Sequence, residues 1–171
     1  MEIKQALLKR LLLGGVFILL LTIIHHIYGG IIYNTPVRFH IAWFAIPTML
    51  VIILLYTLHV RKKTSPTLSK ISLWLFIAVI IFIPFGTFGL AEGGYNHLLK
   101  NILYFGGASE ELMMNLYSDP IFEMPNDFWF EFTGILQFVA GIYIGYVLTG
   151  FWRQPGLCCS AENLAARQPY A

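Results

Sequence analysis

Four apolar stretches constrain the fold of this chain more than any short motif does. They cover residues 11–33, 41–60, 71–91 and 128–152, and none of them contains Lys, Arg or Asp. Their one carboxylate, Glu131, lies near the start of the fourth stretch. Each stretch is close to the ~20 residues that an α-helix needs to cross ~30 Å of hydrocarbon. The sequence therefore predicts an all-α protein, a bundle of four transmembrane helices.

The composition supports a membrane protein with a single domain. Of the 171 residues, 57% are hydrophobic and only 12% are charged, which leaves too little polar surface to cover a soluble globule. We expect one integral membrane domain over residues 1–153 and a polar tail over residues 154–171. The basic residues gather at one membrane face, so nucleic acid is not an expected partner, whereas membrane lipid is.

The charged residues sort by sign along the chain. All but two of the 11 Lys and Arg residues precede the first stretch, separate the second from the third, or follow the fourth. Arg38 and Lys100 are the exceptions, and they share their side with most of the acidic residues. Because cytoplasmic loops are rich in Lys and Arg, both termini are predicted to be cytoplasmic. Segments 34–40 and 92–127 would then lie outside, and a bacterial inner (plasma) membrane is the expected location.

The long outer connection, residues 92–127, is predicted to form a cap with two short helices. Asn96 can begin the first, and Gly106-Gly107 can end it. Ser109 can begin the second, which Asp119-Pro120 would stop. Both are too short to cross a membrane, so they should lie at the interface or fold over the bundle as a lid.

Small residues recur on one face of the fourth stretch, including Gly141 and Gly145 at a four-residue step. Such spacing allows a second helix to approach closely. We expect this face to pack on the first helix near Gly15 or Gly29. The same face is also a candidate contact for another membrane subunit or a second copy of the chain.

Ionisable residues near the outer end of the bundle form the candidate site. A count of ~1.5 Å per residue places His25 and His26 about 21–23 Å from the inner end of their helix, well inside the outer leaflet. Intramembrane ionisable residues are costly and therefore suggest function. The candidate catalytic residues are His26, Glu131, Glu92 and His97, with His26 and Glu131 as the acid/base pair. The candidate binding residues are His25, Arg38, His40 and Asp127, and Arg38 would hold an anionic head group.

The metal and cofactor content is not determined by the sequence. Histidine and carboxylate ligands suit zinc, iron or manganese, but no His-x-x-x-His, His-Glu-x-x-His or Glu-x-x-His spacing occurs. Adjacent histidines are also expected to point about 100° apart on a helix. The same residues have structural explanations, because buried histidines can bond within the bundle, Asp127 can cap the fourth helix and Glu131 can complement its dipole.

Three functions remain open at this point. The first, which fold-level reasoning favours, is an accessory or interaction subunit without its own catalysis. The second is a membrane-embedded enzyme that uses the histidines and carboxylates on a lipid or quinone-like substrate from the outer leaflet. The third is a proton- or metal-coupled carrier. The adjacent Cys158 and Cys159 of the tail have no assigned role, and the external segments contain no cysteine, so disulfides do not hold this fold.

Overall fold

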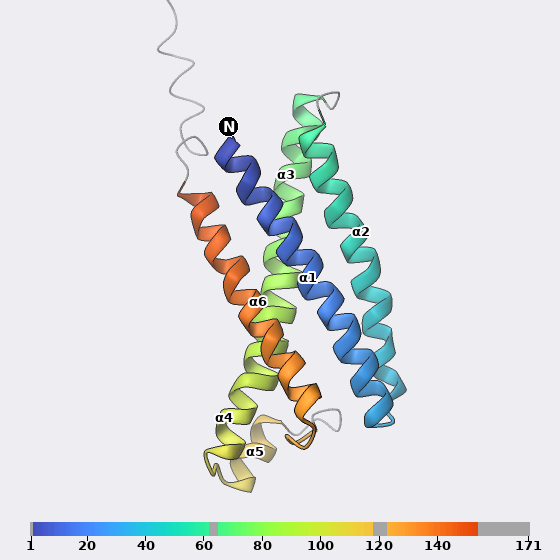
Figure 1. Ribbon diagram of the computed structural model, residues 1–171, viewed down its shortest axis with the longest axis vertical. Helices are drawn as coiled ribbons and strands as arrows, with labels where there is room; N and C mark the ends of the chain where they lie inside the picture. The colour runs from blue at the N-terminus through green and yellow to red at the C-terminus, as the bar shows by residue number, and fades with distance from the viewer. Residues whose placement is uncertain (1, 62–64, 118–122, 154–171) are drawn as a thin grey trace, which may run out of the picture.

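The computed structural model describes residues 2–61, 65–117 and 123–153. This part of the chain is all-helical, and four long helices run side by side (Figure 1). Four segments are long and apolar enough to cross a membrane: Lys4–Ile32, Pro36–Val60, Pro66–Phe105 and Phe128–Trp152. The all-α class and the four membrane-spanning helices predicted from the sequence are therefore confirmed at the level of length and composition.

The elements follow one another with few breaks. The first three are α1 (Glu2–Ile32), the 3-10 turn η1 (Pro36–Phe39) and α2 (His40–Val60). The third span consists of α3 (Pro66–Ile80), the π-helical segment η2 (Ile81–Leu99) and α4 (Lys100–Phe105). The short α5 (Glu110–Leu116) and the long α6 (Phe128–Trp152) complete the described chain.

The third helix is longer than the sequence predicted. It continues for 40 residues to Phe105, whereas the apolar stretch ends at residue 91. The prediction of a separate helix starting at Asn96 is therefore wrong. The Asn96 side chain donates to Glu92 Oε2 (3.0 Å) within the helix and does not cap a new one. The predicted end is confirmed: the chain turns at Gly106-Gly107, and Gly107 has a φ of +80° that favours glycine.

The second short helix, α5, is present and is fixed to the end of η2. Ser109 caps it by accepting a hydrogen bond from the Leu112 amide (3.3 Å). Tyr95 of η2 donates its hydroxyl to the Leu116 carbonyl (2.9 Å), and Tyr117 donates to the Tyr95 carbonyl (3.0 Å). The predicted stop at Asp119-Pro120 lies outside the described residues.

The closest helix pair is η2 with α6. A Cβ added at Gly141 would lie 2.8 Å from the Cα of Gly89, and a Cβ at Gly89 would lie equally close to Gly141. A Cβ on Gly93 would overlap the backbone of Phe138. The backbones of the two helices thus pack directly on each other, which requires glycine at the contact.

This arrangement corrects the predicted role of the small-residue face. Gly141 and Gly145 pack on Gly89 and Phe85 of the third helix, and not on the first helix. The predicted contact between α1 and α6 does exist and involves Gly29 as expected, but its partner on α6 is the ring of Phe130 and not Gly141 or Gly145. The third helix occupies the glycine face because its own glycines permit a closer approach than the side chains of α1 do.

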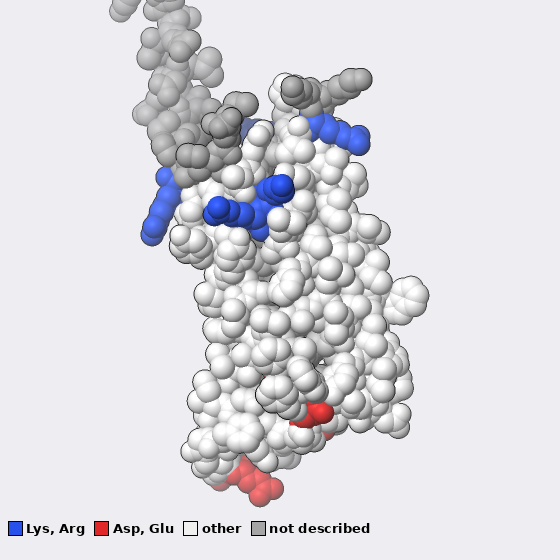
Figure 2. All heavy atoms as spheres, in the orientation of Figure 1, with Lys and Arg blue, Asp and Glu red and all other residues white. Residues whose placement is uncertain are grey.

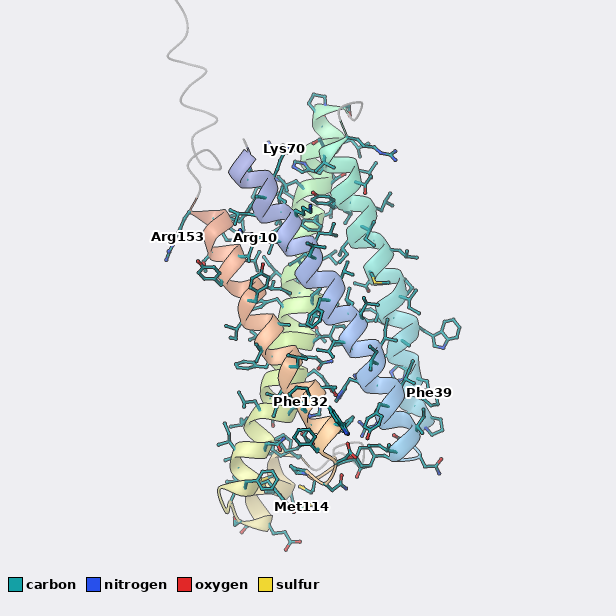
Figure 3. All side chains as sticks on the ribbon, viewed as in Figure 1. Arg10, Phe39, Lys70, Met114, Phe132 and Arg153 are labelled. Carbon is teal, nitrogen blue, oxygen red and sulfur yellow. The ribbon has the colours of Figure 1, made fainter. Side chains whose placement is uncertain are left out.

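Charge and surface character divide the bundle into two ends and a middle. Lys and Arg side chains gather at one end and acidic side chains at the other, with an uncharged surface between them (Figure 2). Arg10, Lys70 and Arg153 lie at the first end and Met114 at the second (Figure 3). Helix α1 begins and α6 ends at the basic end (Figure 1). Large apolar residues such as Trp43 (78% exposed) and Phe82 (72% exposed) cover the sides, as a lipid-facing surface requires.

We predict that Gly141→Leu lowers stability in detergent. The larger side chain would separate η2 from α6, and overpacking of this kind costs about 1–3 kcal/mol. Thermal unfolding of the purified protein measures the effect. Gly150→Leu is the matched control, because a Cβ there meets only Leu7 at an ordinary 3.7 Å. Equal melting temperatures for the two variants would contradict the backbone contact.

Candidate metal centre

A cluster of histidines and carboxylates lies inside the acidic end of the bundle. Helix α1 contributes His25 and His26, the π-helical η2 contributes Glu92 and His97, and α6 contributes Glu131. All three histidines are buried, with exposed fractions of 0%, 8% and 2% for His25, His26 and His97. Three helices that are far apart in sequence therefore converge on one small volume.

One oxygen of Glu92 is the centre of the cluster. The Nε2 atoms of His97, His26 and His25 lie 3.6, 3.7 and 3.8 Å from Glu92 Oε1. These distances exceed the 2.7–3.2 Å range of ordinary N–H···O hydrogen bonds. They are close to the ~3.3 Å that separates two ligand atoms when each lies 2.0–2.1 Å from one tetrahedral zinc ion. Each histidine nitrogen thus lies about 0.3–0.5 Å beyond the spacing of neighbouring ligands around a zinc ion.

The hydrogen bond of His25 directs its free nitrogen toward Glu92. Its Nδ1 lies 2.9 Å from Thr133 Oγ1, and that hydroxyl donates its own proton to the Trp129 carbonyl (2.8 Å). A hydroxyl that gives its proton to this carbonyl accepts from His25, and in that arrangement the proton of the imidazole is on Nδ1. The Nε2 lone pair then faces Glu92, and this buried atom has no hydrogen bond partner among the described residues.

His97 is oriented in the same way by a carboxylate. Its Nδ1 donates to Glu131 Oε2 (2.8 Å), while its Nε2 faces Glu92. Metal-binding histidines commonly give their second N–H to a carboxylate, which fixes the ring and makes the other nitrogen a better ligand. Glu131 thus occupies the position of a supporting carboxylate behind a ligand.

Glu131 is itself compensated by buried donors. Lys100 Nζ lies 3.0 Å from Glu131 Oε1 and also donates to the Glu123 carbonyl (2.6 Å). Asn101 Nδ2 donates to Glu131 Oε2 (2.6 Å). Lys100 and Glu131 are 2% and 6% exposed, so the pair neutralises two charges that could not otherwise be placed in hydrocarbon.

The π-helical winding of η2 explains how Glu92 and His97 share a face. Five residues along an α-helix correspond to a rotation of about 140°, whereas i→i+5 hydrogen bonds bring residues five apart nearly into line. Gly134 of α6 supplies the space for His97, because a Cβ at that position would overlap the imidazole ring. Irregular winding and a glycine in the neighbouring helix together place this ligand.

A cavity of about 210 Å3 borders the cluster. Its polar wall includes His26, Glu92, His97 and Lys100, and its apolar wall includes Phe130. Both ring nitrogens of His26 lack a hydrogen bond partner in the described part of the chain. His25, Glu92 and His97 can form a three-ligand set, with one ligand atom from each lying within 4.8 Å of the others. His26 is thus a third imidazole, at the cavity side of that set.

Arg38 forms part of the cavity wall and is 8% exposed. Its guanidinium carbon lies 5.0 Å from the ring centroid of Phe130 and 5.4 Å from that of Tyr33. Burial and the nearby carboxylate of Asp127 raise the pKa of Tyr33 to about 12, so this ring carries no charge. Phe130 also stacks on His25 (4.2 Å), and one aromatic ring therefore connects Arg38 with a candidate ligand.

The structure regroups the residues that the sequence singled out. His25, His26, Glu92 and His97 come together, but the described contacts pair Glu131 with His97, and the carboxylate beside His26 is that of Glu92. Although adjacent on α1, His25 and His26 both place their Nε2 atoms within 3.8 Å of the same Glu92 oxygen.

The remaining candidates lie at the edges of the site. His40 lines the cavity, and its Nδ1 contacts the Val37 carbonyl. Asp127 caps α6 by accepting from the Phe130 amide (2.8 Å) and also accepts from Tyr28 (3.2 Å). Lys100, Asn101 and Thr133 were missed by sequence reasoning. Of these three, only Lys100 was noticeable in the sequence, because it is a cation on the acidic side.

Comparisons of the chain with protein-family models, curated proteins and solved structures found no match.

We predict that Glu131→Gln destabilises the protein by about 3–5 kcal/mol, because it leaves the buried Lys100 without its charge partner. Thermal unfolding in detergent measures the loss. The double variant Glu131→Gln/Lys100→Met should recover part of it, since no uncompensated charge remains. Glu110→Gln on the exposed side of α5 is the control and should change little. A Glu131→Gln protein as stable as that control would show that the pair carries no such charge coupling.

Proposed function

We propose that this protein is a membrane-embedded, metal-dependent hydrolase whose metal ion is bound by His25, Glu92 and His97. The observation that carries the proposal is the arrangement of buried imidazole Nε2 atoms at 3.6–3.8 Å from one Glu92 oxygen. With the His25 proton on Nδ1, the Nε2 lone pair faces a carboxylate oxygen, so two acceptors meet unless a cation lies between them.

The ligand types favour a zinc-like ion. Two imidazoles and one carboxylate bind zinc in metalloproteases, and such catalytic sites keep a further position for water. The supporting contacts of Thr133 and Glu131 hold the two histidines in the ligand tautomer without reaching the metal position themselves. Fully oxygen-liganded ions such as Mg²⁺ suit this set of nitrogen donors less well.

The cavity supports catalysis in preference to a purely structural metal. A bound metal ion would supply an activated water molecule for attack on an ester. His26, which lines the cavity and has both nitrogens free of partners among the described residues, is placed to take a proton from that water. The same imidazole can return the proton to the alcohol that leaves, so that one ester and one water give one acid and one alcohol. No oxidant or further reactant is required.

This proposal replaces the accessory subunit that the sequence alone favoured. A subunit without chemistry would have no use for buried nitrogens beside a cavity that lack a hydrogen bond partner among the described residues, and such groups are costly in a membrane. The accessory subunit and the metal carrier remain distinct outcomes of the experiments. We place the protein in a bacterial inner membrane with membrane lipid around it, and we place the metal centre near the outer face.

We predict that the purified protein binds one Zn²⁺ or Co²⁺ per chain after treatment with a chelator and dialysis. His25→Ala, His97→Ala and Glu92→Gln should each weaken binding at least tenfold, because each removes a ligand. Metal analysis and the visible spectrum of Co²⁺ measure this. His59→Ala at the opposite end of the bundle is the matched control. Binding should also fall as pH drops below neutrality, because ligand histidines must be unprotonated.

Three outcomes separate the functions. Metal-restored hydrolysis of p-nitrophenyl phosphate or p-nitrophenyl acetate, lost in His26→Gln with metal retained, supports the hydrolase. Metal uptake into proteoliposomes without hydrolysis supports the carrier and overturns the hydrolase. If no metal binds, or if His59→Ala loses as much metal affinity as the ligand variants, the accessory subunit is the better interpretation.

The membrane orientation gives a separate prediction. With Cys158 and Cys159 replaced by Ser, Asn115→Cys on the exposed surface of α5 should react with a membrane-impermeant maleimide added to intact cells. Ser65→Cys at the other end should react only after the membrane is opened. The expectation follows from the basic residues at the end that holds Ser65. The reverse labelling pattern would invert the topology and place the metal centre near the cytoplasm.

A further inference from the structure

We propose that the cavity beside the metal centre binds a phosphate-type oxyanion between the metal, Arg38 and Lys100. This inference rests on the proposed metal centre and adds the chemical class of the substrate. It starts from the two cations that break the charge pattern of the chain, since Arg38 and Lys100 both line this cavity.

The position of Arg38 suits recognition of an anion. The guanidinium is nearly buried and lies over Phe130 and Tyr33, so its aromatic neighbours restrict its orientation. A guanidinium has five N–H donors in one plane, so it can bind phosphate oxygens in addition to its contacts within the protein. Phe130 also packs on His25, so Arg38 and the metal ligands surround the same space.

Lys100 retains a donor for a ligand. An ammonium group has three protons, and in the described residues Nζ uses two of them, for Glu131 Oε1 and the Glu123 carbonyl. The remaining proton is available on the side of the cavity that Lys100 lines. The two fixed contacts anchor the side chain, so that a ligand does not have to order it.

Charge balance explains why the ligand is an anion. Among the described residues, the charged side chains that line this cavity are Arg38, Lys100, Glu92 and Glu123. With neutral histidines these four charges cancel, and a divalent metal ion makes the lining two charges positive. A surplus charge in a poorly solvated site is unfavourable, so the loaded centre should recruit an anion.

The number of donors favours phosphate over carboxylate. The metal, Arg38 and Lys100 approach from three elements of the bundle, and a phosphomonoester has three free oxygens, whereas a carboxylate has two. A cavity of about 210 Å3 exceeds the ~30 Å3 share of one water several times, which leaves room for such a group. The apolar residues Val37, Ile41 and Phe130 complete the wall. A soluble phosphate ester and a lipid phosphomonoester head group are the two possible sources.

The test is a titration of the Co²⁺-loaded protein with inorganic phosphate, followed by the visible spectrum of Co²⁺. Wild-type protein should show a saturable spectral change. Arg38→Gln should raise the Kd for phosphate about tenfold or more, because one charged hydrogen-bonding group is lost. Arg38→Lys keeps the charge, so its Kd for phosphate should lie between those of the wild-type protein and Arg38→Gln. Arg61→Gln is the matched control, with the same change at the opposite end of the bundle.

The source of the phosphate is resolved in nanodiscs. Phosphatidic acid in phosphatidylcholine should compete with inorganic phosphate if the ligand is a lipid head group, and should have no effect if it is soluble. Either result supports the inference. An unchanged Co²⁺ spectrum at saturating phosphate, or equal Kd values for Arg38→Gln and Arg61→Gln, would overturn it while leaving the metal centre intact. Failure to bind Co²⁺ at all would instead remove the proposed function.

Discussion

The direct contact between the backbones of η2 and α6 determines the rest of this structure. With no side chain between Gly89 and Gly141, the two helices approach until Gly93 meets the backbone of Phe138. This approach brings His97 over Gly134 and within hydrogen-bonding distance of Glu131. Dispersion and close packing drive helix association in lipid, since lipid tails and apolar side chains are equally apolar. A glycine contact therefore sets the positions of the polar residues.

The polar cluster is stable in this position because its carboxylates and Lys100 have fixed hydrogen bond partners. Glu131 receives hydrogen bonds from His97, Lys100 and Asn101, and Glu92 receives one from Asn96. By contrast, the Nε2 atom of His25 and both ring nitrogens of His26 lack hydrogen bond partners in the described residues. A network that satisfies the supporting groups and leaves the inward nitrogens unpaired is the organisation expected of a preformed ligand site.

The structural hydrogen bonds and the cavities lie at different depths in the bundle. Deeper than the histidines, Gln137 donates to Thr22 (3.0 Å), and both side chains are fully buried. Toward the acidic end, the cavity of about 210 Å3 borders His26 and Arg38, and a second cavity of about 380 Å3 reaches Glu131 from the side of Phe105 and Phe132. Glu131 thus lines the second cavity and is hydrogen-bonded to His97 and Lys100, which line the first.

The sequence by itself determined the helical class, the number of spanning helices and the separation of charge. These follow from segment length, hydropathy and residue sign, which are local properties. It also identified the end of α4 and the start of α5, since Gly106-Gly107 and Ser109 act through their own backbone and side chain. His25, His26, Glu92 and His97 were recognisable as unusual because ionisable residues are costly in hydrocarbon.

Only the tertiary structure decided which of these residues meet. In a regular α-helix Glu92 and His97 would lie about 140° apart, and the π-helical winding of η2 brings them closer to one face. The partner of the Gly141 face depended on which helix offered the smallest opposing surface, and Gly89 of the third helix did so. The ligand geometry around Glu92 joins residues from α1 and η2, with Glu131 and Thr133 of α6 behind them. No spacing in one segment encodes a distance between three helices, because packing across the whole bundle sets it.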